Sequence, residues 1–126
     1  MSLLNALMGN ADAVDAARVQ ADFAHVLIAG ERVEHAYKLI RDMVVFTNER
    51  LIMIDKQGMT GKKVEFHSIP YSKITHFSVE TAGTLDLDSE LKIAVSGGAH
   101  FSKTFGRGVD INDVQRVLAA HVLKVS

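Results

Sequence analysis

The side chains of this chain that are suited to metal chemistry are its histidines. The sequence holds six of them, at His25, His35, His67, His76, His100 and His121. No two stand in the H-x-x-x-H spacing that places two imidazoles on one face of a helix. His67, His76 and His100 fall on three separate predicted strands, and a metal site needs three or four supported ligands. We therefore predict no metal site and no cofactor.

Carboxylates alternate once along the chain, at Asp86, Asp88 and Glu90 in the stretch DLDSE. Alternating carboxylates ligate calcium in loops of the D-x-D-x-D-G type. The glycine and the later bidentate glutamate of that pattern are missing here, and alternation also fits the solvent face at the start of a strand. We interpret the stretch as a solvated strand entrance.

The sequence contains none of the motifs that are typical of a catalytic site. There is no G-x-S-x-G elbow and no phosphate loop. The chain has no cysteine, which excludes a thiol nucleophile, a thiolate zinc site and a disulfide scaffold. Glu80 is a single carboxylate at a predicted strand end, and acid-base catalysis usually needs a positioned partner. We predict that the protein is not an enzyme.

Composition and charge exclude further classes of function. The 126 residues carry 14 Lys plus Arg against 15 Asp plus Glu, for a net charge of -1, which argues against a general nucleic-acid binder. Apolar runs such as Met43–Phe46 and Leu51–Ile54 are four residues long, whereas a membrane span needs about 20. The opening MSLLNALMGN lacks the basic region of a secretory signal, so we expect a cytoplasmic protein.

Hydrophobic spacing predicts a helix at each end of the chain. Residues 2–23 carry a small-residue apolar stripe, with a break near Gly9 and Asn10, and residues 110–125 form an amphipathic helix with Asp110 as N-cap. The stripe consists of Leu4, Leu7, Ala11, Val14, Ala17 and Ala21. One helix is enough to plug a seven-stranded barrel, so the stripe on residues 2–23 is left as spare apolar surface. We predict oligomer contacts at Leu4, Leu7, Ala11 and Val14.

Short β-rich runs separated by turn residues predict seven strands between the two helices. The predicted strands are Val33–Ile40, Asp42–Thr47, Arg50–Asp55, Lys63–Ile69, Ile74–Thr81, Ser89–Val95 and Ala99–Phe105. Gly97-Gly98 is expected to be a tight turn, and Pro70–Lys73 a single turn of helix. The expected fold is mainly β, a closed or nearly closed antiparallel barrel capped by the C-terminal helix.

Several segments in order resemble the bacterial pleckstrin-homology (PH) domain family. They are LIAGERV at 27–33, FTNERLIMIDKQGMTGKK at 46–63, IPYSKI at 69–74, VETAG at 79–83 and DLDSELKI at 86–93. The resemblance covers about residues 25–125, so we divide the chain into a helical extension, 1–24, and a PH-like domain, 25–126. It implies a seven-stranded PH-like barrel with a C-terminal helix. It also implies a ring-like homo-oligomer without a defined biochemical activity.

In this fold the first and third hairpins open on the same side, with Gly97-Gly98 as a third loop. A candidate anion site therefore consists of Lys38, Arg41, Lys56, Lys62 and Lys63. The alternative is a set of solvated hairpin charges balanced by Asp42 and Asp55. The K/R-x-R pair with which eukaryotic relatives bind inositol lipids is absent, because Asp42-Met43-Val44 follows Arg41. We expect weak or no binding to membrane lipids.

Two functions remain. The first is a non-enzymatic interaction and assembly module that forms a homo-oligomeric ring and has room for an unidentified protein partner. The second is a module that binds an anion or a lipid headgroup weakly at the open end of the barrel. Charge-driven lipid binding should weaken with salt, whereas apolar assembly should not.

Overall fold

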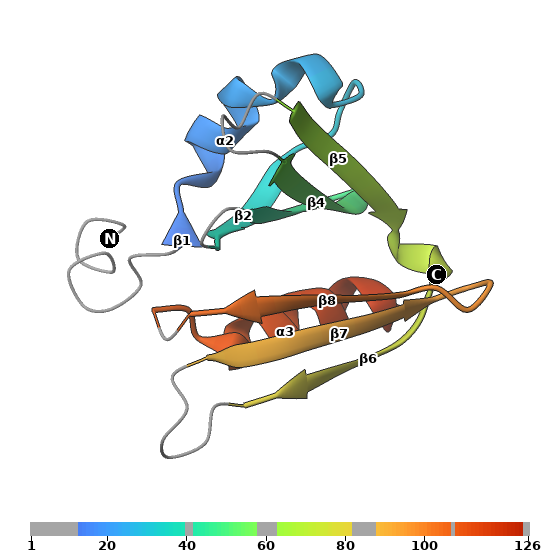
Figure 1. The fold of residues 1–126 in the computed structure, drawn as a ribbon. Coiled ribbons are helices and arrows are strands. Elements are labelled where there is room, and N and C mark those ends of the chain that lie inside the picture. The colour runs from blue at the N-terminus through green and yellow to red at the C-terminus, as the bar shows by residue number, and fades with distance from the viewer. Residues whose placement is uncertain (1–12, 40–41, 58–62, 82–87, 107, 125–126) are drawn as a thin grey trace.

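Two antiparallel sheets and a C-terminal helix make up the fold (Figure 1). The computed structural model describes residues 13–39, 42–57, 63–81, 88–106 and 108–124. The five-stranded sheet has the order β1-β2-β3-β4-β5, with strands Ala13–Val14, Val33–Lys38, Met43–Thr47, Arg50–Gln57 and Lys63–Pro70. The three-stranded sheet has the order β6-β7-β8, with strands Ile74–Glu80, Ser89–Val95 and His100–Phe105. The helices are α2 (Ala16–Asp22), α3 (Ile111–Val122) and the 3-10 turns η1 (Ala24–Val26) and η2 (Tyr71–Lys73).

All seven predicted strands are confirmed, together with the C-terminal helix and the turn of helix after Pro70. Strand β7 has its predicted bounds, and η2 follows Pro70 as expected. Helix α3 begins after Asp110, whose side chain accepts a hydrogen bond from the amide of Asn112 at 3.0 Å. Gly97 and Gly98 have φ values of 95° and 94°, which glycine adopts without strain. The predicted mainly β fold with a C-terminal helix is therefore confirmed.

The N-terminal prediction is wrong at residues 13–14. These residues form the short strand β1, in which Val14 lies opposite Ala36 of β2. Among the residues that the structure describes, the first helix begins at Ala16, after the N-cap Asp15, whose side chain accepts from the Ala17 amide at 3.0 Å. Pairing with the edge of β2 outweighs the helix propensity of this stretch, because it satisfies backbone groups at both edges. Leu4, Leu7 and Ala11 lie outside the described residues.

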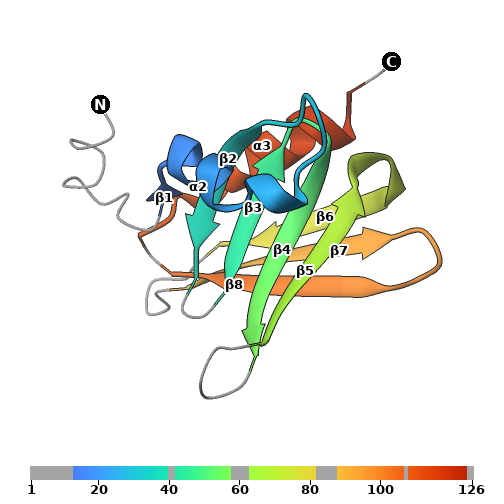
Figure 2. The same cartoon turned by 90° about the horizontal axis from the view of Figure 1, so that it is seen from above.

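The central strands β3 and β4 of the five-stranded sheet are buried on both faces. Its inner face faces the second sheet and α3, with Val44, Phe46 and Leu51 among the fully buried residues. Its outer face is covered by α2 and η1, with Val45 and Ile52 buried around Val19 of α2 (Figure 2). Neighbouring residues of one strand thus enter two different apolar clusters, which explains the unbroken apolar runs in the sequence.

The two sheets cross, and α3 closes one end of the space between them (Figures 1 and 2). Ile111, Val114 and Leu118 of α3 lie in the same buried cluster as Leu91 of β7 and Phe105 of β8. No ladder joins the two sheets within the described residues. The two sheets therefore do not join through backbone hydrogen bonds into a closed barrel in this part of the chain. Side-chain packing across the core holds them together.

Candidate functional site

The candidate anion site lies where β2 and β4 end and β5 begins, at one end of the five-stranded sheet (Figure 2). Lys38 ends β2 and Lys63 begins β5, and both side chains are exposed. Strand alternation places Lys38 on the outer face, in phase with Ala36, and Lys63 on the inner face, in phase with Ile69. These two cations therefore point to different faces of the sheet.

The other members of the set are only partly described. The backbone of Lys56 lies in β4, opposite Val64 of β5, whereas Arg41 and Lys62 lie outside the described residues. The Gly97-Gly98 turn is not a third loop at this end, contrary to expectation. The amide of Ser96 donates to the carbonyl of Lys73 at 2.9 Å, which places the turn beside η2, at the far end of β5.

Carboxylates occupy the inner face of the sheet at this same end. Asp55 of β4 lies opposite Glu65 of β5, and Asp42 directly precedes the pair formed by Met43 and Ile54. Lys103 of β8 reaches Asp42 from the second sheet, with Nζ 3.0 Å from Oδ2, and both side chains are largely buried. This acidic end, formed by Asp42, Asp55 and Glu65, would repel an anion that entered between the sheets.

The pKa of Asp55 is raised above its usual value by this arrangement. The main cause is its hydrogen bond with Asp42, followed by the repulsion between the two carboxylates, which Lys103 only partly offsets. Because the folded pKa of Asp55 lies above its ordinary pKa of 3.8, the protonated carboxyl contributes to the free energy of unfolding below pH 3.8. This contribution is lost as the pH rises through the raised pKa. At neutral pH the ionised Asp55 therefore costs stability.

Replacing Asp55 by asparagine should stabilise the protein at pH 7. The Asp55→Asn amide keeps a donor for Asp42 and removes the like charge, so the urea midpoint of unfolding should rise. The gain should disappear at acid pH, where Asp55 of the native protein is protonated. Glu49→Gln, at an exposed turn position, serves as the control with an unchanged midpoint. A lower midpoint in Asp55→Asn at pH 7 would contradict this interpretation.

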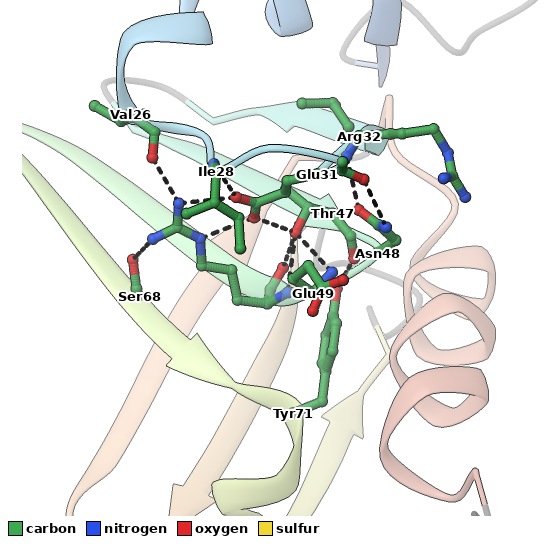
Figure 3. A network of polar contacts seen from close by, with 12 residues as sticks. Val26, Ile28, Glu31, Arg32, Thr47, Asn48, Glu49, Ser68 and Tyr71 are labelled. Carbon is green, nitrogen blue, oxygen red and sulfur yellow. Dashed lines mark hydrogen bonds and ion pairs between the residues drawn. The ribbon is translucent and has the colours of Figure 1, made fainter.

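A buried polar network, which sequence reasoning did not single out, fastens the segment before β2 to the sheet (Figure 3). Its centre is Glu31, whose side chain is fully buried against Arg50. Arg50 donates from Nε to Oε2 at 2.9 Å and from Nη2 to Oε1 at 3.0 Å. The hydroxyl of Thr47 donates to Oε2 at 2.7 Å, and the Ile28 amide donates to Oε1 at 3.0 Å. Both carboxylate oxygens of Glu31 are therefore satisfied.

The same network extends to β5 and η2. Arg50 also donates to the Val26 carbonyl at 2.7 Å and to Oγ of Ser68 at 2.9 Å, and the Tyr71 hydroxyl donates to the Thr47 carbonyl at 2.7 Å. Burial alone would raise the pKa of Glu31, but the hydrogen bonds from Arg50, Thr47 and the Ile28 amide outweigh burial and lower it. The network is thus a structural latch, with its ionised carboxylate fully paired.

The groups considered for catalysis do not come together. His67 lies on β5, in ring contact with Phe101 at 4.6 Å between centroids. Glu80 lies at the end of β6, with 73% of its side chain exposed, beside Lys92. Within the described ranges, no group of three or more histidine and carboxylate side chains is placed to hold a metal ion. No catalytic constellation follows from these positions.

Two further regions bear on binding. A hollow of about 280 Å³ at the end of the second sheet is lined by Glu80, Thr81, Asp88, Ser89, Glu90 and Thr104, so its walls carry acidic and hydroxyl groups. Val14, a predicted oligomer contact, is partly buried and packs against the outer-face cluster of its own chain.

Among the helices of the described residues, none has the length and apolar character needed to span a bilayer.

Comparison with known proteins gives relatives of nearly full length. The family model described as "Bacterial PH domain" matches residues 2–122. The uncharacterized protein YjqA of Bacillus subtilis (strain 168) is 56% identical over 122 residues, covering 95% of this chain and 98% of that protein. The uncharacterized protein YozO of the same organism is 35% identical over 108 residues, covering 86% of this chain and 90% of the relative.

Solved structures agree with this match. A pleckstrin homology domain from Shewanella amazonensis SB2B superimposes with a TM-score of 0.83 at 50% identity, over 97% of this chain and 99% of the other. A DUF1696 family protein with a pleckstrin-homology domain from Shewanella loihica PV-4 gives a TM-score of 0.79 at 46% identity, over 87% and 95%. With its seven main strands, its C-terminal helix and these matches over nearly its full length, the chain belongs to the bacterial PH domain family.

Proposed function

We propose that this chain is a non-enzymatic interaction and assembly module that forms a homo-oligomeric ring. The observation that carries the proposal is the free edge of β5, the outermost strand of the five-stranded sheet. Strand β5 pairs with β4 over eight residues without a bulge, and no strand of the described chain pairs with its other edge. A long regular edge strand is a template for pairing with another chain.

The backbone groups that face this edge can be assigned from Pro70. Pro70 has no N–H, so its pairing with Arg50 is of the non-hydrogen-bonded type. The alternate residues of β5 are then bonded to β4, and Val64, Phe66 and Ser68 direct their N–H and C=O groups toward the free edge. Val64 is 41% exposed, which adds an apolar contact beside these groups.

The acidic end supports assembly over anion binding as the main function. Lys103 is engaged by Asp42, while Lys38 and Lys63 point to different faces of the sheet. A multiply charged headgroup needs several converging cations, because each exposed pair contributes little. Binding to anionic liposomes should therefore be weak, insensitive to headgroup identity and lost in high salt.

A proline at the free edge tests the proposal. Val64→Pro removes an N–H that faces the partner and leaves the β4–β5 ladder intact, so the variant should fold but assemble into a smaller species. Val64→Thr keeps the N–H and a β-branched side chain and should assemble like the native chain. Molar mass by light scattering, with circular dichroism as the check on folding, gives the answer.

An unchanged mass in a folded Val64→Pro variant would remove the β5 edge from the interface. Deletion of residues 1–12 would then test the predicted contacts at Leu4, Leu7 and Ala11. Headgroup-selective liposome binding at submicromolar affinity, lost in Lys63→Ala, would instead favour the anion-binding function.

A further inference from the structure

The solvent face of the three-stranded sheet brings together two histidines from its two outer strands. His76 of β6 and His100 of β8 both lie opposite Ala94 of the central strand β7. Cross-strand partners project from the same face of a sheet, so both imidazoles stand on one side of Ala94. Both histidines are exposed, whereas Ala94 beneath them is only 4% exposed.

The two rings lie slightly farther apart than two imidazoles that share one metal ion. Their centroids lie 6.5 Å apart, with an interplanar angle of 57°. A metal ion stands about 2.1 Å from each imidazole nitrogen, which places two ring centres that share it roughly 5 to 6 Å apart. Exposed side chains change rotamer on a nanosecond timescale, so a small rotation of either ring closes the remaining gap.

The type of ligand atom and the neighbouring charges determine which metal ion the two histidines can bind. Imidazole nitrogens suit zinc, copper and nickel, while calcium and magnesium prefer oxygen ligands. The next charged residue along β7 on this face is Lys92, whose ammonium lies 3.7 Å from Glu90 and 4.0 Å from Glu80. The two carboxylates therefore offset the positive charge of Lys92, which lowers its repulsion of a cation bound at the two histidines.

We propose that His76 and His100 form a two-imidazole site for a divalent transition-metal ion on the outer face of the β6-β7-β8 sheet. Water completes the coordination, so the ion is exchangeable and is not a resident cofactor. The sequence prediction of no metal site rests on the separate strands of His67, His76 and His100. Sheet order joins two of these strands through β7, while His67 contacts Phe101 on β8.

Isothermal titration of the metal-stripped full chain with zinc chloride, and separately with copper(II) chloride, tests the proposal. One ion per chain should bind, with copper tighter than zinc. His76→Gln and His100→Gln should each weaken zinc binding at least about tenfold, since losing even the support behind a ligand costs about 10- to 100-fold. His35→Gln, an exposed histidine on β2, is the matched control and should bind like the native chain.

A second readout separates this site from adventitious binding. Zinc should raise the melting temperature of the native chain and of His35→Gln by mass action, but not that of the double variant His76→Gln/His100→Gln. The proposal is overturned if zinc affinity stays within twofold of native in both single variants. It is also overturned if His35→Gln weakens binding as much as they do, or if the native chain binds no zinc at millimolar concentration.

Discussion

Arg50→Ala should lower the free energy of unfolding at pH 7 by about 3 to 5 kcal/mol, the cost of leaving one member of a buried ion pair without its partner. Arg50 supplies two of the hydrogen bonds to the Glu31 carboxylate, and the Glu31 side chain has no solvent exposure. The variant also loses the contacts of Arg50 with Val26 and Ser68, which tie the segment before β2 to β5. Urea denaturation followed by circular dichroism measures the loss.

The pH dependence gives this prediction a sign that simple loss of packing would not. The folded pKa of Glu31 lies below its ordinary value of 4.5, so the stability it contributes is present above pH 4.5 and disappears as the pH falls through the lowered value. The difference between native chain and Arg50→Ala should therefore shrink in acid. Glu49→Ala, the exposed neighbour, should change stability by no more than about 0.5 kcal/mol. A loss below 1 kcal/mol in Arg50→Ala would contradict the role given to the latch.

Leu51→Ala and Ile52→Ala should each cost about 2 to 5 kcal/mol, although the two residues are adjacent on one strand. Leu51 is fully buried in the inner cluster, and Ile52 is 2% exposed in the outer cluster beneath α2. In a sheet with one solvated face, only one of two neighbouring residues would carry such a cost. The comparison thus measures whether α2 and η1 complete a second core.

Ser102→Ala, on the exposed face of β8, is the control and should stay within about 0.5 kcal/mol of the native chain. Equilibrium unfolding in urea gives all three values. A near-neutral Ile52→Ala would show that the outer face of the five-stranded sheet is not a core in solution.

The strands and the C-terminal helix could be predicted because their signals are local. Alternation and turn residues define β6 to β8, and Asp110 with its apolar periodicity defines α3. The continuous apolar runs Met43–Phe46 and Leu51–Ile54 indicate the covering element on the outer face as well as the strands. A strand that is apolar at every position is typical of burial on both faces, and it requires a further covering element such as α2.

The N-terminal element and the polar latch could not be predicted in this way. The two-residue strand β1 exists only because β2 offers an edge, so its cause lies outside its own sequence. Glu31 and Arg50 stand 19 residues apart in the sequence, with β2 and β3 between them. Their pairing therefore depends on how these strands fold back on one another. The same holds for His76 and His100. They lie near each other only because β6 and β8 both pair with β7 and both histidines stand opposite Ala94.

The molar mass of the 126-residue chain in solution tests the assembly proposal most directly. Light scattering coupled to size-exclusion chromatography, at micromolar concentration and in both low and high salt, should give a single species of several times 13.8 kDa. The mass should not fall in high salt, because backbone pairing at the β5 edge and apolar contacts are little screened. A single species of 13.8 kDa under both conditions would contradict the proposal that this PH-like domain is an assembly module.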